Sequence, residues 1–374
     1  MKFKDVIGHE DIKDRLRHMA DTDRVPHALL FGGPAGVGKM KIARAFAQYL
    51  QCTDRHNGDS CGRCPSCLQH AQFANPDMNF VFPVLKKGSK SRVLSADWMD
   101  EWKQFLTEEP YMKRERWLEL LDAGNGQPVI YVNEAAEIAR TAIMSNYASK
   151  QKIYLIWLPE SMNVETANKL LKLIEEPWEN TIFLMVSNEP SQLLPTIFSR
   201  TQRLNFRPLS ENNIAEYLIS KGVSADSAAR IARHSEGSAL RADELALDKG
   251  ESAEFGKMYR AMMRATYGRN IAELYELSEH LSGCGREHSS RFLDYCSHMA
   301  RENFMYNLRM PQIVSLSPEE EEFSRRFSPF VNHRNVENLV AETERARHEI
   351  MRNANSRVVL FDMMLQIARY IRVK

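Results

Sequence analysis

The sequence has no long apolar run and no excess of charge of one sign. No stretch reaches the ~20 consecutive apolar residues of a membrane span. Residues 1–12 carry charges throughout and lack the apolar core of a signal peptide, so a cytoplasmic protein is expected. The 50 Lys and Arg residues balance 49 Asp and Glu residues, for a net charge of +1. This balance disfavours a stand-alone nucleic-acid binder, although it leaves room for DNA contacts shared among subunits.

Cysteine is scarce, and its distribution is uneven. A disulfide framework is not expected in a cytoplasmic protein. Four of the six cysteines form a C-x8-C-x2-C-x2-C pattern, which consists of Cys52, Cys61, Cys64 and Cys67. Tetrahedral zinc needs four ligands at short reach, and paired C-x2-C turns supply them. Incidental buried cysteines and an iron–sulfur cluster are the alternatives. Because all four ligands would be thiolates, the site has no open position for catalysis, and a structural zinc is predicted.

The first ~205 residues alternate short apolar runs with amphipathic helical patterns, which predicts a parallel sheet with crossover helices. The runs are apolar on both faces, as in a sheet covered on both sides. The predicted strands are Ala28–Phe31, Val129–Val132, Ile153–Leu158 and Ile182–Ser187. A helix is predicted to begin after Asn163 as its N-cap and to end before Pro177.

Other segments depart from this alternation. Segment 78–128 is less regular and reads as an elaboration on the first domain, with two Trp-containing helices. Its basic loop Lys86–Arg92 could touch phosphate, but a solvated surface loop is the favoured interpretation. Arg207–Ser210 is predicted to be a linker, since Pro208 ends the preceding extended run. Helical patterns dominate everything after it.

A glycine-rich loop follows the first predicted strand. Gly33, Gly36, Gly38 and Lys39 fit the pattern G-x4-G-K, and a helix follows directly. This strand–loop–helix context is the one in which backbone N–H groups cradle phosphates and the lysine reaches the outer ones. The alternative is a turn that only connects strand and helix. The context favours a phosphate loop.

The residues that would hold a metal at this loop are missing. Met40 stands where a Ser or Thr hydroxyl should bind Mg²⁺, and a thioether is a poor ligand for a hard cation. Trp157 and Leu158 stand where two carboxylates should end a later strand, while Glu160 is displaced beyond Pro159. Three requirements of metal-assisted hydrolysis therefore fail together. We expect no intrinsic ATPase activity, and weak or absent binding of ATP or ADP.

Several motifs together resemble a known family. The first two-thirds of the chain is similar to the clamp-loader branch of the AAA+ ATPases, and within it to the delta-prime type of bacterial DNA polymerase III subunit. The motifs are the loop Gly33–Lys39, the cysteine segment 52–67, and two signatures, Asn168–Pro177 (N-x-LLK-x-[LI]-EEP) and Leu194–Thr201 (LPTI-x-SR). Thr201 replaces the cysteine that usually ends the second signature. Segment 353–369 resembles the last helix of the family more weakly.

The resemblance implies three domains. They are an α/β AAA+ domain with a parallel sheet and a zinc-binding insert at residues 1–207, a small helical lid at 208–248, and an all-α collar at 249–374. Arg200 matches the arginine finger that is offered to ATP bound by a neighbouring subunit. Arg241 matches the lid arginine that faces the subunit's own nucleotide site.

The resemblance also implies partners. They are the motor (tau/gamma) and delta subunits of a pentameric ring, and, through the ring, the sliding clamp and primed DNA. Within the DNA polymerase III holoenzyme this chain would itself have neither ATPase nor polymerase activity. Two alternatives remain: an active tau/gamma-type motor ATPase, which should have carboxylates at 157 and 158, and a zinc-containing DNA-binding AAA+ protein.

Overall fold

The structure is a computed structural model that describes residues 1–86, 92–124, 126–144, 146–147, 149–247, 251–308, 314 and 316–372. The chain divides into two compact units, Met1–Ala246 and Leu247–Lys374. Each unit has its own apolar core. Most of the basic loop Lys86–Arg92 lies outside the described residues, as does the predicted boundary between 248 and 249.

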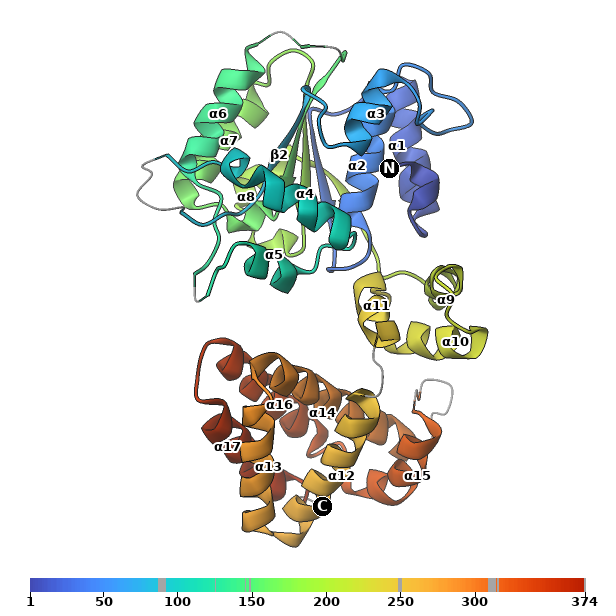
Figure 1. Cartoon of the computed structure of the whole chain (residues 1–374), viewed down its shortest axis with the longest axis vertical. Coiled ribbons are helices and arrows are strands. Elements are labelled where there is room, and N and C mark those ends of the chain that lie inside the picture. Colours follow the sequence, from blue (N-terminus) through green and yellow to red (C-terminus); the bar gives the residue numbers. More distant parts are fainter. Residues whose placement is uncertain are drawn as a thin grey trace. The chain divides into compact units, whose positions relative to one another are not determined.

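A five-stranded parallel sheet forms the centre of the first unit, as the sequence predicts (Figure 1). The strand order is β2-β3-β4-β1-β5. The strands are β1 (Ala28–Gly32), β2 (Met78–Val81), β3 (Lys152–Trp157), β4 (Thr181–Ser187) and β5 (Gln202–Asn205). Every residue of β1, β3 and β4 is buried, because helices cover both faces of the sheet.

One predicted strand is wrong, and two strands were not predicted. Val129 and Ile130 make only isolated bridges, to Val84 and Met162, and a helix begins at Val132. An apolar run this short does not build a ladder when helical backbone follows it at once. The strands β2 and β5 are short, lie at the two edges of the sheet, and contain polar or exposed residues. Their pattern therefore lacks the continuous apolar run of the buried strands.

Helices cover the sheet on both sides (Figure 1). Leu29 and Phe31 pack with helices α1, α2, α4 and α5, whereas Ala28 and Leu30 pack with α6, α7 and α8. The helices are η1 (Phe3–Asp5), α1 (Glu10–Asp21), α2 (Lys39–Gln51), α3 (Pro65–Ala71), η2 (Ser95–Trp98), α4 (Met99–Glu108), α5 (Arg114–Leu120), α6 (Val132–Ala142), η3 (Pro159–Ser161), α7 (Val164–Glu175), η4 (Pro190–Gln192) and α8 (Pro195–Arg200). The predicted cap of α7 is confirmed, since Asn163 accepts a hydrogen bond from the N–H of Thr166 at 2.8 Å.

Three helices complete the first unit. They are α9 (Glu211–Ser220), α10 (Ala225–His234) and α11 (Ala239–Leu247). Ser210 and Ser224 cap the first two of them through their hydroxyl groups. Their small core contains Ile214, Leu218 and also Tyr111, which comes from the segment between α4 and α5. This helical region is therefore packed against the elaboration that precedes it in the chain.

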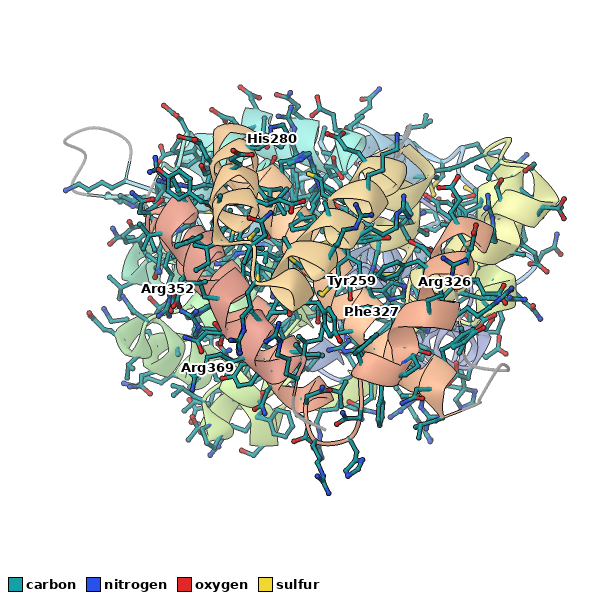
Figure 2. All side chains as sticks on the ribbon, turned by 90° about the horizontal axis from the view of Figure 1, so that it is seen from below. Tyr259, His280, Arg326, Phe327, Arg352 and Arg369 are labelled. Atoms are coloured by element: carbon teal, nitrogen blue, oxygen red, sulfur yellow. The ribbon has the colours of Figure 1, made fainter. Side chains whose placement is uncertain are left out.

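Helices are the regular secondary structure of the second unit in its described residues, as the sequence predicts. Its helices are α12 (Glu251–Gly268), α13 (Ile271–Gly283), α14 (Arg286–Asn307), α15 (Pro318–Phe327), η5 (Ser328–Phe330), α16 (Val336–Met351) and α17 (Ser356–Tyr370). Tyr259 and Phe327, both labelled in Figure 2, lie edge to face with ring centroids 6.2 Å apart. None of the described helices has the length and apolarity that crossing a membrane would require.

Candidate functional site

The glycine-rich loop lies between β1 and α2, at the carboxyl end of β1, which pairs with β4 on one side and β5 on the other. Gly36 and Gly38 have φ angles of 78° and 93°, which favour glycine. A Cβ atom on Gly36 would lie 2.1 Å from the hydroxyl oxygen of Ser238. The N–H of Ala239, which begins α11, donates to the carbonyl of Gly36 at 3.0 Å. The helical region α9–α11 thus contacts the loop directly, through the start of α11.

Lys39 is bonded to its own loop. Its Nζ donates to the carbonyl oxygens of Gly33 at 2.7 Å and Pro34 at 2.5 Å. The residue is only 4% exposed. Burial lowers the pKa of Lys39 to about 7, although the nearby charge of Glu160 acts in the opposite direction. The lysine that would contact outer phosphates is therefore already occupied and shielded from water.

The hollow beside this loop is only the size of a water molecule. Its volume is about 10 Å³, and it is bounded by the loop, by Trp157 at the end of β3, and by Tyr111 and Met112. The last two residues belong to segment 78–128, which sequence analysis gave no functional role. No sequence motif marks them, because their importance comes from where the connection between α4 and α5 folds.

Tyr111 links the loop to the helical region. It is buried, its ring lies edge to face with Tyr217 of α9 at 5.6 Å, and the Nζ of Lys41 lies 4.7 Å from its ring centroid. Two residues later, Lys113 forms an ion pair with Glu244 of α11 at 2.8 Å. The segment between α4 and α5 therefore contacts both the edge of the hollow beside the phosphate loop and the helices that follow the sheet.

The positions that would bind and activate a metal are apolar. Met40 and Trp157 are 3% and 1% exposed, and the Trp157 ring packs 5.3 Å from that of Trp102. Glu160 accepts hydrogen bonds from the N–H groups of Asn188 and Glu189, at 2.9 and 3.2 Å. Its carboxylate therefore ties η3 to the end of β4.

Arg241, another predicted site residue, and Ser187 come from two different elements, α11 and β4. Arg241 is in the first turn of α11, and its Nη1 pairs with Glu236 at 3.1 Å. Ser187 ends β4, and its buried hydroxyl oxygen has no hydrogen-bond partner among the described residues. Neither side chain lines the hollow beside the phosphate loop.

Arg200 is the last residue of α8, and its side chain is 43% exposed. Its Nε lies 2.5 Å from a carboxylate oxygen of Glu175, the last residue of α7. Its Nη1 also donates to the carbonyl of Thr196 at 3.3 Å. Arg200 does not line the hollow beside the chain's own phosphate loop. It is a partly exposed cation that another protein could reach.

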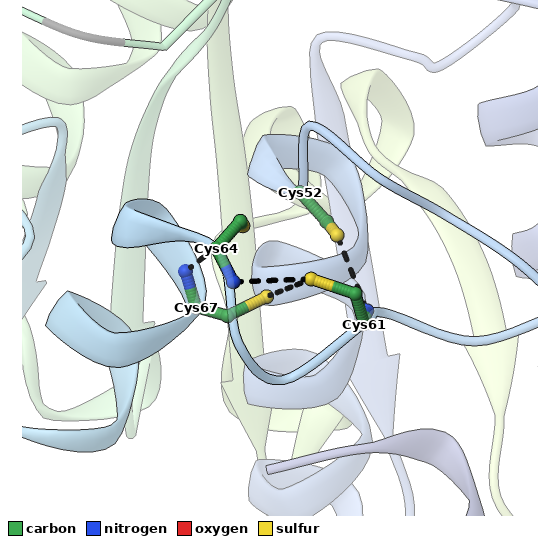
Figure 3. Close-up of side chains that lie close together, drawn as sticks. All are labelled: Cys52, Cys61, Cys64 and Cys67. Atoms are coloured by element: carbon green, nitrogen blue, oxygen red, sulfur yellow. Dashed lines mark hydrogen bonds between the residues drawn. The ribbon is translucent and has the colours of Figure 1, made fainter.

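The four clustered cysteines come together in the connection from α2 to α3 (Figure 3). Their sulfur atoms all lie within 4.8 Å of one another, so the group could hold a metal ion. Cys52 follows the end of α2, and Cys64 is the N-cap of α3. The cap places Cys67 one turn into that helix, which turns its sulfur back toward the cluster.

The geometry of the cluster fits tetrahedral zinc. Four sulfurs at about 2.3 Å from one ion would be about 3.8 Å apart, and the sulfurs of Cys61 and Cys67 are 3.9 Å apart. Backbone N–H groups also point at the sulfurs, as they do at thiolates. The N–H of Cys61 donates to Cys52 at 3.3 Å, and that of Cys64 donates to Cys61 at 3.2 Å.

Comparison with known proteins places these features in a family. Residues 8–210 match the family described as "DNA polymerase III, delta subunit". A gamma/tau subunit of DNA polymerase III from Mycobacterium bovis is 30% identical over 209 residues, which cover 55% of this chain and 29% of that protein. A delta' subunit from Bacillus subtilis is 28% identical over 209 residues, which cover 56% of this chain and 50% of that protein.

The similarity is thus concentrated in part of the molecule. The chain spans less than a third of the mycobacterial relative and half of the one from Bacillus subtilis. The solved structure of a gamma subunit-related protein from Thermotoga maritima aligns over 96% of this chain and 99% of that one, with a TM-score of 0.43 and 12% identity. At these values the likeness adds nothing to the fold described above.

Proposed function

The chain belongs to the DNA polymerase III delta subunit family, within the AAA+ clamp loaders, and from this premise we propose that it is a delta-prime-like subunit. In this role it does not hydrolyse ATP. It completes the active site of a neighbouring motor subunit while a sliding clamp is loaded on primed DNA. Because the relatives include both gamma/tau and delta' subunits, the choice between these types depends on individual residues.

The state of the phosphate loop is the observation that carries this proposal. Lys39 is bonded to two carbonyls of its own loop, and the adjoining hollow has the volume of one water molecule. Met40 and Trp157 offer no ligand to a magnesium ion. A site whose lysine is bonded to its own loop and that has no metal ligands is that of a subunit that does not hydrolyse ATP.

Arg200 supports a role at a neighbouring site. It is a partly exposed guanidinium outside the chain's own loop, where it can approach the transferred phosphoryl group of ATP held by the next subunit. There it would stabilise negative charge that develops in the transition state. To do so, Arg200 must break its ion pair with Glu175 and bind the phosphate oxygens instead. Arg241 takes the place of the lid arginine, although here it pairs with Glu236.

Zinc is the metal that we assign to the cysteine cluster. Cys52, Cys61, Cys64 and Cys67 would all bind it as thiolates, and the ion would cross-link the connection between α2 and α3. With four protein ligands the ion keeps no position for water or substrate. Its contribution is therefore to folding rather than to catalysis.

The rest of the proposal concerns assembly. Residues 1–207, 208–248 and 249–374 act as nucleotide-binding-like, lid and collar domains, and the collar holds a pentameric ring with tau/gamma and delta subunits in the cytoplasm. The experiment mixes the full chain with purified tau/gamma and delta subunits and follows size-exclusion chromatography and ATPase activity. We expect one stable complex and no hydrolysis by the isolated chain. Hydrolysis by the isolated chain would instead identify a motor subunit.

A further inference from the structure

A second hollow lies away from the phosphate loop, between α2, α3 and β2. Its volume is about 10 Å³, and its walls include Arg44 and Gln48 of α2, His70 of α3, and Phe73 and Asn75 from the following connection. None of these residues has a part in the function proposed above. Met1 also lines the hollow, and its N-terminal amino group donates to Gln48 at 3.0 Å, so the guanidinium of Arg44 is the positive group without a described acceptor.

Arg44 has no anionic partner in the described part of the chain. Its guanidinium lies 4.6 Å from the ring centroid of Phe73, and no described carboxylate or carbonyl accepts a hydrogen bond from it. Burial lowers the pKa of Arg44 to about 10, so the group stays charged at neutral pH. A guanidinium offers five N–H donors. The side chain is only partly buried, so water can solvate part of the guanidinium, and no described residue supplies an acceptor for the rest.

The other polar groups around the hollow are already in use. Gln48 donates to the hydroxyl of Ser60 at 2.7 Å, and Asn75 donates to the hydroxyl of Ser66 at 3.2 Å. His70 is within hydrogen-bond distance of Gln51, at 2.6 Å. Burial lowers the pKa of His70 to about 4, with the positive charges of the N-terminal amino group and of Arg44 acting in the same direction. The histidine is therefore neutral at pH 7, and these neighbours provide no negative charge.

We propose that this hollow is an oxyanion site in which Arg44 binds a phosphate group, either free inorganic phosphate or a phosphate of nucleic acid. The volume admits one oxygen atom, so the group inserts one oxygen and leaves the others at the mouth. Free inorganic phosphate is favoured over a carboxylate because it carries more charge at neutral pH and offers more acceptor oxygens; a phosphate of nucleic acid carries a single charge on two free oxygens. The phosphate loop is a separate site. The proposal that Arg44 binds phosphate therefore does not depend on the proposed function of that loop.

The test is calorimetric titration of the full chain with inorganic phosphate at constant ionic strength. We expect a dissociation constant of about 1 mM for one charge-assisted contact. Arg44→Gln should weaken binding at least about tenfold, because it removes a charge-assisted hydrogen bond to the phosphate. Arg44→Lys, which keeps the charge, should weaken it less. Arg15→Gln, which removes an exposed arginine of α1, is the matched control and should leave binding unchanged.

Further variants and ligands decide between the outcomes. Lys39→Gln should bind phosphate as the wild type does; loss of binding there, with retention in Arg44→Gln, would assign phosphate to the glycine-rich loop and overturn the proposal. Absence of binding by the wild type, or equal binding of acetate, would also overturn it. A single-stranded oligonucleotide distinguishes the two sources. Binding of it that depends on Arg44 points to nucleic acid, whereas binding of free phosphate alone points to the inorganic ion.

Discussion

The guanidinium of Arg200 forms an ion pair with Glu175, and its Nε lies 2.5 Å from the carboxylate. The two residues end consecutive helices, α8 and α7, and both belong to signatures recognised in the sequence. Both side chains are partly exposed, at 43% and 38%, so the pair contributes little to stability, about 0–1 kcal/mol. A pair this weak can be exchanged for a stronger contact with phosphate oxygens at small cost.

Replacing Arg200 with alanine should impair clamp loading without unfolding the protein. In a reconstituted clamp loader we expect Arg200→Ala to lower the rate of DNA-stimulated clamp loading at least about tenfold, because arginine fingers are worth about 10³–10⁵ in rate. The measurement is a loading assay with labelled clamp and primed DNA, together with ATPase activity.

The matched control for this variant is Glu175→Gln. It breaks the same ion pair but leaves the finger in place, so it should retain loading. If both variants lost clamp-loading activity equally, the ion pair itself would be needed for the local structure. The assignment of Arg200 as an arginine finger would then be wrong. Equal loading by Arg200→Ala and wild type would also reject it.

A second prediction concerns Tyr111 and nucleotide binding. Because Tyr111 borders the hollow beside the phosphate loop, Tyr111→Ala should enlarge it and raise the affinity for a fluorescent ATP analogue. Truncation of a buried aromatic side chain should also lower the free energy of unfolding by about 3–5 kcal/mol. Met40→Thr alone should not raise nucleotide affinity greatly, and because Met40 is buried in the core it should also lower the free energy of unfolding. Neither variant should hydrolyse ATP, since no carboxylate ends β3 at Trp157. Tight, Mg²⁺-dependent nucleotide binding by the wild type would contradict this account.

The sequence predicts the buried parts of the fold well. The strands β1, β3 and β4 are continuous apolar runs, and the Asn163 cap and Pro177 bracket α7, so physical rules for burial and capping suffice. The rules do not predict the edge strands β2 and β5, because each pairs with a neighbouring strand on one side only and need not be a continuous apolar run. The same rules mislead at Val129–Val132, where an apolar run precedes a helix.

The candidate site was predictable only where local spacing defines the chemistry. The glycine-rich loop and the four cysteines are recognisable because their residues are close in sequence, and the structure brings both sets together. Tyr111 and Arg44 are not recognisable in this way. Their importance depends on contacts with distant residues, such as Tyr217 at 5.6 Å and Phe73 at 4.6 Å. Nothing in the residues next to them encodes those contacts.

A third prediction is that metal binding depends on Cys61. Its sulfur accepts the N–H groups of Arg63 and Cys64 and lies 3.9 Å from that of Cys67. Cys61→Ser should therefore lower the zinc content well below one ion per chain and lower the unfolding temperature by several degrees. Elemental analysis and thermal unfolding measure the two effects. The exposed Cys284 is the matched control, and Cys284→Ser should change neither. A zinc-free wild type would refute the assignment.

The last prediction concerns the pH dependence of stability at Glu134. Burial raises the pKa of this carboxyl from 4.5 to about 7, although it accepts a hydrogen bond from the N–H of Ser95. Between pH 4.5 and 7 the unfolded chain loses this proton and the folded chain keeps it, so the free energy of unfolding falls as pH rises. Glu134→Gln removes the titration. It should match the wild type at pH 4 and be more stable above pH 7, by up to about 3 kcal/mol. Denaturant unfolding at several pH values measures the difference; a constant difference across this range would exclude Glu134 as its cause.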